Sequence, residues 1–184
     1  MQPSRLILLA CLIASPAFAR LGDTQEQAAD RYGIPKQTQP PKYGQPLLEG
    51  AKELTFEYKG WKIRCALLLA TDGVSYVVRE EYTKLLKPGG SLQISEDERK
   101  AIFEGEGGLT NWSERRAGSA LQLLQNQLTC GLLGPNWVRA ADSAVAVLSL
   151  GGSPLRLELP QALKYEQELK AIKAQQTKAA VPKF

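Results

Sequence analysis

The chain has 184 residues, of which 43% are hydrophobic and 23% are charged, enough apolar side chain for one core of ordinary size. It contains no histidine. That absence excludes a Ser-His-Asp or Cys-His catalytic site and removes the most frequent transition-metal ligand. The sequence also has no glycine motif for a phosphate or a dinucleotide. We therefore expect no cofactor and no metal site.

The formal net charge of +4 comes entirely from the two ends of the chain, with Arg5 as the one charged residue before residue 20. From residue 161 onward there are five lysines and two glutamates, whereas residues 20–160 carry equal numbers of acidic and basic side chains. Nucleic-acid binding usually needs a basic patch on the folded domain. We therefore expect no nucleic-acid partner.

The first residues have the pattern of an export signal. Arg5 precedes an apolar run over Leu6–Ala14, and a small-x-small pattern ends at Ala19. The run is too short to cross a bilayer, which takes roughly 20 residues. This predicts cleavage between Ala19 and Arg20, no membrane span, and a mature chain in the periplasm or the medium. The alternative is a lipoprotein signal that lipidates Cys11.

The mature chain is predicted to begin with a short helix. Thr24 and Gln27 form a capping box at its start, and Gly33 provides the left-handed stop at its end. Residues 34–50 then hold four prolines, which fix the backbone and remove hydrogen-bond donors. This segment is predicted to be an extended connector within the domain.

Three segments of alternating polarity follow, over residues 54–59, 61–67 and 74–79. The turns Lys59-Gly60 and Asp72-Gly73 between them favour hairpins. The pattern predicts an antiparallel meander with one apolar face and one face in water. The apolar face of the middle segment carries Trp61, Ile63, Cys65 and Leu67.

The second half contains a further capping box and several shorter patterns. Ser95 and Glu98 open a helix that we expect to end near Glu104. Further elements are predicted as a short helix over 119–127, strands over 137–140, 145–150 and 155–159, and a terminal helix over 161–176.

Together these elements predict a single α+β domain over residues 20–177, with a disordered tail over 178–184. The domain is expected to contain an antiparallel sheet of five or six strands, with a short N-terminal helix, one mid-chain helix and a C-terminal helix.

Two cysteines remain after removal of the signal, and disulfides persist in exported proteins. Cys65 and Cys130 are therefore a possible disulfide. The alternative is that Cys65 is a small core residue, because it lies on the apolar face of its strand.

Carboxylates are the remaining candidates for catalysis or calcium binding. The acids Glu80, Glu81, Glu104 and Glu106 allow an acid/base pair in principle. However, adjacent acids on a strand point to opposite faces, and the acids over 96–98 are explained by helix capping. We therefore predict no catalytic residue and keep a carboxylate-dependent hydrolase as the alternative function.

The tryptophans are candidates for a binding surface. Trp61 lies on the predicted core face of its strand, whereas Trp112 and Trp137 each begin a β segment after a glycine-containing loop. Trp112 and Trp137 are therefore the candidate binding residues, and core packing is the alternative for both.

The pattern Leu21-Gly22-Asp23-Thr24-x-x-Gln27, followed by Tyr32-Gly33-x-Pro35 and aromatic strands, resembles the opening of small exported α+β modules. These include the outer-membrane-assembly lipoproteins and the β-lactamase inhibitory proteins, and the resemblance covers residues 20–83. The whole chain resembles small bacterial exported proteins of uncharacterised function. The resemblance implies an exported, non-enzymatic protein that binds another protein or an envelope component.

Overall fold

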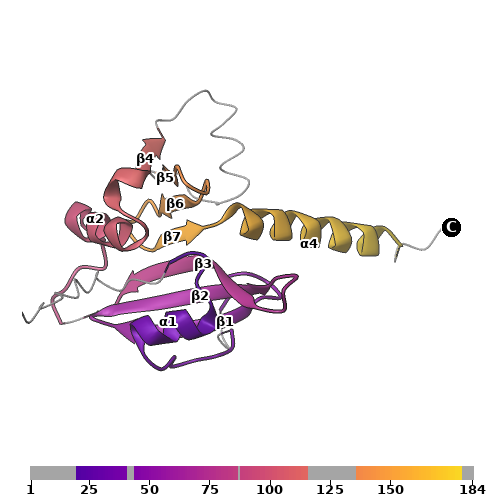
Figure 1. Ribbon diagram of the computed structural model, residues 1–184, viewed down its shortest axis with the longest axis horizontal. Helices are drawn as coiled ribbons and strands as arrows, with labels where there is room; N and C mark the ends of the chain where they lie inside the picture. Colours follow the sequence, from indigo (N-terminus) through magenta and orange to yellow (C-terminus); the bar gives the residue numbers. More distant parts are fainter. Residues whose placement is uncertain (1–19, 41–43, 87, 116–135, 180–184) are drawn as a thin grey trace, which may run out of the picture.

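The computed structural model describes residues 20–40, 44–86, 88–115 and 136–179. These residues form an α+β fold around one antiparallel seven-stranded sheet with the order β1-β2-β3-β7-β6-β5-β4 (Figure 1). The strands are β1 (Lys52–Tyr58), β2 (Trp61–Leu69), β3 (Ser75–Lys84), β4 (Trp112–Arg115), β5 (Asn136–Arg139), β6 (Val145–Leu148) and β7 (Leu155–Glu158).

The described part of the chain also contains three α-helices, which are α1 (Gln25–Tyr32), α2 (Glu96–Gly105) and α4 (Pro160–Ala179). The capping boxes predicted at Thr24 and Ser95 are both present, and Gly33 follows α1 with a φ of 84°. Helix α4 leaves the sheet after β7 and projects beyond it (Figure 1). It continues two residues into the segment predicted as a tail. The predicted helix over 119–127 lies outside the described residues.

The predicted meander is confirmed as β1, β2 and β3, with an irregularity in its register. Cys65 pairs with Glu80 and Ala66 with Arg79, but the next pair is Leu67 with Val77. Val78 is therefore the extra residue of a β-bulge, which changes the face to which the following residues point. The simple alternation predicted over 74–79 missed this change.

The expectation that one face of the meander is in water is wrong for its centre. One face packs against α1 and α2, and the opposite face is covered by residues 47–51 and the start of α4. Charged residues on this second face are buried in ion pairs, such as Arg79 with Glu158 at 2.7 Å. The proline-rich connector folds back over the sheet, with Leu47 and Leu48 buried.

The sheet has seven strands, one more than the upper end of the predicted range of five or six. The additional strand is β4, which begins at Trp112, where the sequence indicated a β segment, and pairs with β5. Its four residues include only one apolar side chain, too few for alternation to define a strand. Residues 79–82 of β3 pair with residues 155–158 of β7 and join the two halves of the sheet. Among the described residues, no helix is long and apolar enough to cross a membrane.

Candidate functional site

An apolar pocket lies between the β1–β2 turn, the middle strands and α2. Its volume is about 140 Å³. A cavity of roughly 150 Å³ is large enough to hold a benzene ring, so this pocket has room for about one aromatic side chain. Its lining residues are Tyr58, Lys59, Trp61, Ile63, Tyr82, Glu98, Ala101 and Ile102.

The tight β1–β2 turn brings two aromatic rings to the surface end of the pocket. Lys59 and Gly60 both adopt left-handed backbone conformations, with φ values of 47° and 85°, as two-residue hairpin turns require. Tyr58 and Trp61 are consequently register partners, and both rings are partly exposed. On the other side, Ala101 of α2 is exposed. The pocket therefore reaches the protein surface.

Among the described residues around the pocket, one cation has no carboxylate partner. Glu98 accepts hydrogen bonds from Lys84 Nζ and from the Ser95 amide, each at 2.7 Å. Burial acts to raise the pKa of Glu98, but these hydrogen bonds outweigh it and lower that pKa. Lys59 Nζ instead lies 4.9 Å from the Tyr58 ring centroid and forms no ion pair with any described residue.

Tyr82 joins this pocket to a second group of residues in the core. Its ring lines the pocket and meets the Trp61 ring edge-on at 6.4 Å. Its hydroxyl oxygen lies 2.9 Å from Glu80 Oε2, 3.2 Å from Glu106 Oε1 and 3.1 Å from the Tyr32 hydroxyl. Tyr82 is only 1% exposed, so its ring belongs to the buried floor of the pocket, and its hydroxyl points into the core.

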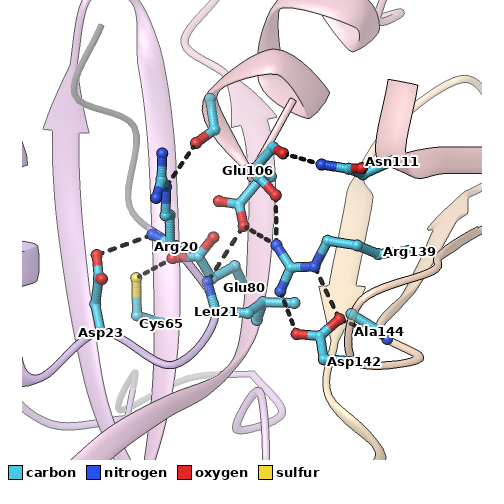
Figure 2. A network of polar contacts seen from close by, with 12 residues as sticks. Arg20, Leu21, Asp23, Cys65, Glu80, Glu106, Asn111, Arg139, Asp142 and Ala144 are labelled. Atoms are coloured by element: carbon cyan, nitrogen blue, oxygen red, sulfur yellow. Dashed lines mark hydrogen bonds and ion pairs between the residues drawn. The ribbon is translucent and has the colours of Figure 1, made fainter. Parts of the chain in front are cut away.

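This second group, which we call the buried carboxyl cluster, consists of Glu80, Tyr82, Glu106 and Arg139. Glu80 on β3 and Glu106 after α2 are both 0% exposed. The Leu21 amide donates to Glu106 Oε2 at 3.2 Å, and Arg139 Nη1 lies 3.5 Å from the same oxygen (Figure 2). The cluster thus ties together the N-terminal segment, β3, the loop after α2 and β5.

The two carboxyl groups of the cluster have shifted proton affinities. Burial raises the pKa of Glu80, and burial together with the charge of Glu80 raises the pKa of Glu106 well above its usual range. Two adjacent buried carboxyl groups do not readily ionise together. The pair therefore retains a proton at pH values at which an exposed glutamate has lost it.

The loop after α2 explains how Glu106 comes to point inward. Gly107 and Gly108 both have left-handed φ values, 108° and 97°, which turn the chain sharply after the helix. Arg139 Nη1 also donates to the Glu106 carbonyl, and the Asn111 side chain donates to the Gly107 carbonyl. Arg139 is itself held by Asp142, with Nη2 and Oδ2 2.7 Å apart.

The convergence of Glu80 and Glu106 is the geometry that the hydrolase alternative requires. Two carboxyl groups bridged by a hydroxyl are a chemically reasonable acid/base pair. However, neither carboxyl group lines the pocket, and neither has exposed surface. A substrate seated in the pocket would meet the ring of Tyr82 rather than the acids.

The other acids named from the sequence have structural partners. Glu81 points to the face opposite Glu80, as predicted, and pairs with Arg64 at 3.0 Å and Arg156 at 3.1 Å. Glu104 is exposed and accepts a hydrogen bond from the Leu109 amide at 2.7 Å. Neither carboxylate joins Glu106.

Trp112 and Trp137, the candidate binding residues, are both buried, with 8% and 6% of their surface exposed. Phe103 stacks on Trp112 at 4.7 Å and meets Trp137 at 5.4 Å, and Arg99 covers the outer side of Trp137 at 4.2 Å. These contacts agree with the core-packing alternative. Both rings offer little surface to a partner.

Cys65 is a free thiol that is completely buried, in agreement with the core-residue alternative. Its Sγ lies 3.6 Å from Glu80 Oε1 as a weak donor. Burial raises the pKa of this thiol well above its usual range, with Glu80 adding to the effect, so Cys65 is not an activated nucleophile. Cys130, the other half of the possible disulfide, lies outside the described residues.

Sequence reasoning named Glu80 and Glu106 but did not predict their pairing, and it missed the pocket. One available signal was the position of Glu80, a glutamate in phase with the core-facing Tyr82 on the same strand. A charged residue at such a position needs a partner in the core. The sequence pattern could not identify Glu106, 26 residues later, as that partner, because the two residues come together only through the fold.

Within the described residues, no three of the side chains of histidine, cysteine, aspartate and glutamate are grouped so that they could hold a metal ion. Comparison of the chain with protein-family models, with curated proteins and with solved structures finds no match.

Proposed function

We propose that this chain is an exported, non-enzymatic binding protein, and that its pocket receives an apolar side chain of a protein partner. The single observation that supports this most is the character of the pocket. It reaches the surface, its wall contains three aromatic rings, and its volume suits one inserted ring. Aromatic side chains inserted into such pockets are typical centres of binding energy in protein interfaces.

The position of the acids favours binding over catalysis. A general acid or base must come within hydrogen-bond distance of the reacting atoms, directly or through one water. Glu80 and Glu106 are fully buried behind Tyr82, and Arg139 occupies one carboxylate oxygen. Export rests on the signal pattern of the first 19 residues, and the resemblance of the opening motif to binding modules adds further support.

The proposal is tested by filling the pocket. Ala101→Trp adds a large ring to an exposed position on the pocket wall without removing any core side chain. Lys100→Trp is the matched control, because it adds the same ring to the neighbouring exposed position on α2. Each variant is used as bait in an envelope extract of the source organism, and the captured proteins are identified and quantified by mass spectrometry.

The proposal predicts that a protein captured by the unmodified chain and by Lys100→Trp is lost with Ala101→Trp. The same protein should be captured by Glu106→Gln. Equal capture by Ala101→Trp and Lys100→Trp would overturn the assignment of the pocket. Turnover of an envelope glycan or peptide that Glu106→Gln abolishes would instead support the hydrolase alternative.

A further inference from the structure

We propose that the pocket recognises an aromatic side chain with a carboxylate beside it, in an acidic segment of the partner protein, and that Lys59 selects the carboxylate. This inference rests on the proposed function and adds the chemistry of the partner. It follows from three features at the pocket: its size, its wall and its unbalanced cation.

The wall favours an aromatic ring over an aliphatic side chain. Trp61 and Tyr82 already meet edge-on at 6.4 Å, and Tyr58 lies at the surface end of the pocket. A further ring placed among them would gain edge and face contacts in addition to the burial of apolar surface. The volume of about 140 Å³ limits the inserted group to about one ring.

The charges favour an anionic neighbour for that ring. Among the described residues, the only carboxylate that lines the pocket is Glu98, which is already bound by Lys84 and by the Ser95 amide. Lys59 also lines the pocket, is exposed, and rests its ammonium on the Tyr58 ring rather than on a described carboxylate. A carboxylate held at the rim by the inserted ring would find this ammonium without displacing an existing ion pair.

The inference can be tested with short peptides and a matched pair of lysines. The probes are acetyl-Gly-Phe-Glu-Gly-amide, its Phe-Lys counterpart and its Ala-Glu counterpart. Binding to ¹⁵N-labelled protein is followed through the indole N–H signal of Trp61, which is assigned with Trp61→Phe. Lys62 is the control position, because it is also exposed but points to the opposite face of β2 from Trp61.

We expect the Phe-Glu peptide to bind roughly two- to fivefold more tightly than the Phe-Lys peptide, the size of effect given by an exposed ion pair. Lys59→Gln should remove the difference and Lys59→Glu should reverse it, while Lys62→Glu leaves it unchanged. Added salt should reduce the preference, since exposed charges are screened. The Ala-Glu peptide should not move the Trp61 signal.

The outcomes separate this inference from the proposed function. Equal binding of the Phe-Glu and Phe-Lys peptides would overturn the role of Lys59 and leave an apolar binding pocket. Absence of binding by either peptide, with partner capture still lost in Ala101→Trp, would overturn the aromatic-acidic ligand and leave the pocket as the site of contact. Partner capture that is insensitive to Ala101→Trp would overturn both.

Discussion

The two sides of Tyr82 differ in what they offer. On one side its ring faces an apolar pocket that reaches the surface beside an exposed lysine. On the other side its hydroxyl contacts two buried carboxyl groups that are held by Arg139 and the Leu21 amide. The pocket therefore has exposed surface but few polar groups, whereas the buried carboxyl cluster has polar groups but no exposed surface.

This difference indicates that polar residues in a fold are not by themselves a sign of catalysis. The buried carboxyl cluster joins four segments that are far apart in the sequence, so its clearest role is to hold the two halves of the sheet together (Figure 2). The pocket contributes few such ties. We therefore expect changes in the cluster to affect stability and changes in the pocket to affect binding.

The largest effect on stability is expected for Arg139→Met. This change keeps much of the side-chain volume but leaves the buried carboxyl groups without their cation. Breaking a buried ion pair by removing one partner costs on the order of 3 kcal/mol or more of unfolding free energy. Urea denaturation followed by circular dichroism measures this loss. Arg115→Met, on the exposed side of β4, is the control and should change the unfolding free energy by less than about 0.5 kcal/mol.

A second prediction concerns pH. Because the pKa values of Glu80 and Glu106 are raised in the folded state, the stability that the pair contributes is fully present below the unfolded pKa of about 4.3. It is lost as the pH rises through the raised folded values. The unfolding free energy of the unmodified chain should therefore contain a component that decreases from about pH 5 upward.

Glu106→Gln should make this decrease smaller, because an amide cannot ionise. The comparison is made by urea denaturation between about pH 5 and pH 8, where exposed acids and lysines do not titrate. Tyr32, Cys65, Tyr82 and Arg139 face the pair, and none of them is expected to change charge in this range. The charge of Asp23 also acts on Glu80, and it is present in both proteins. Parallel pH profiles for the two proteins would contradict the shared proton.

Tyr82→Phe should affect the buried carboxyl cluster and leave the pocket unchanged, because it removes the hydroxyl but keeps the ring. Glu80 and Glu106 would lose the hydroxyl that contacts both of them, which should lower the unfolding free energy by about 1 to 2 kcal/mol. The pocket wall would be unchanged. Peptide binding measured by the Trp61 signal should therefore stay within about twofold of the unmodified chain, the size of a small change in packing. A large loss of binding would mean that the cluster and the pocket act as one site.

The local features of the fold could be predicted from the sequence, whereas its long-range features could not. Capping boxes and hairpin turns act through residues a few positions apart, so α1, α2 and the β1–β3 meander follow from their patterns. The burial of the second sheet face depends on the return of the connector and the start of α4, which no local pattern encodes.

The candidate site, like the fold, could be predicted from the sequence only in its local features. Tyr58, Trp61 and Tyr82 are visible in the sequence as aromatic residues on strands, but the pocket exists only where α2 packs beside them. Trp112 and Trp137 looked more available because each follows a loop, yet Phe103 covers both. Whether a side chain is exposed is decided by the packing of distant elements, so it could not be derived from spacing.

The smallest effect on stability is expected for Ala101→Trp, the variant that should abolish binding. Trp forms helices less readily than Ala, which costs a few tenths of a kcal/mol at an exposed helical position. The new ring gains apolar burial if it enters the pocket, which offsets this cost. The net change in unfolding free energy should be within about 0.5 kcal/mol, as is usual for substitutions near the surface. Urea denaturation and the peptide titration are done on the same preparation. A loss of binding accompanied by a loss of several kcal/mol would mean that the pocket wall supports the fold, and the contrast between the two sides of Tyr82 would not hold.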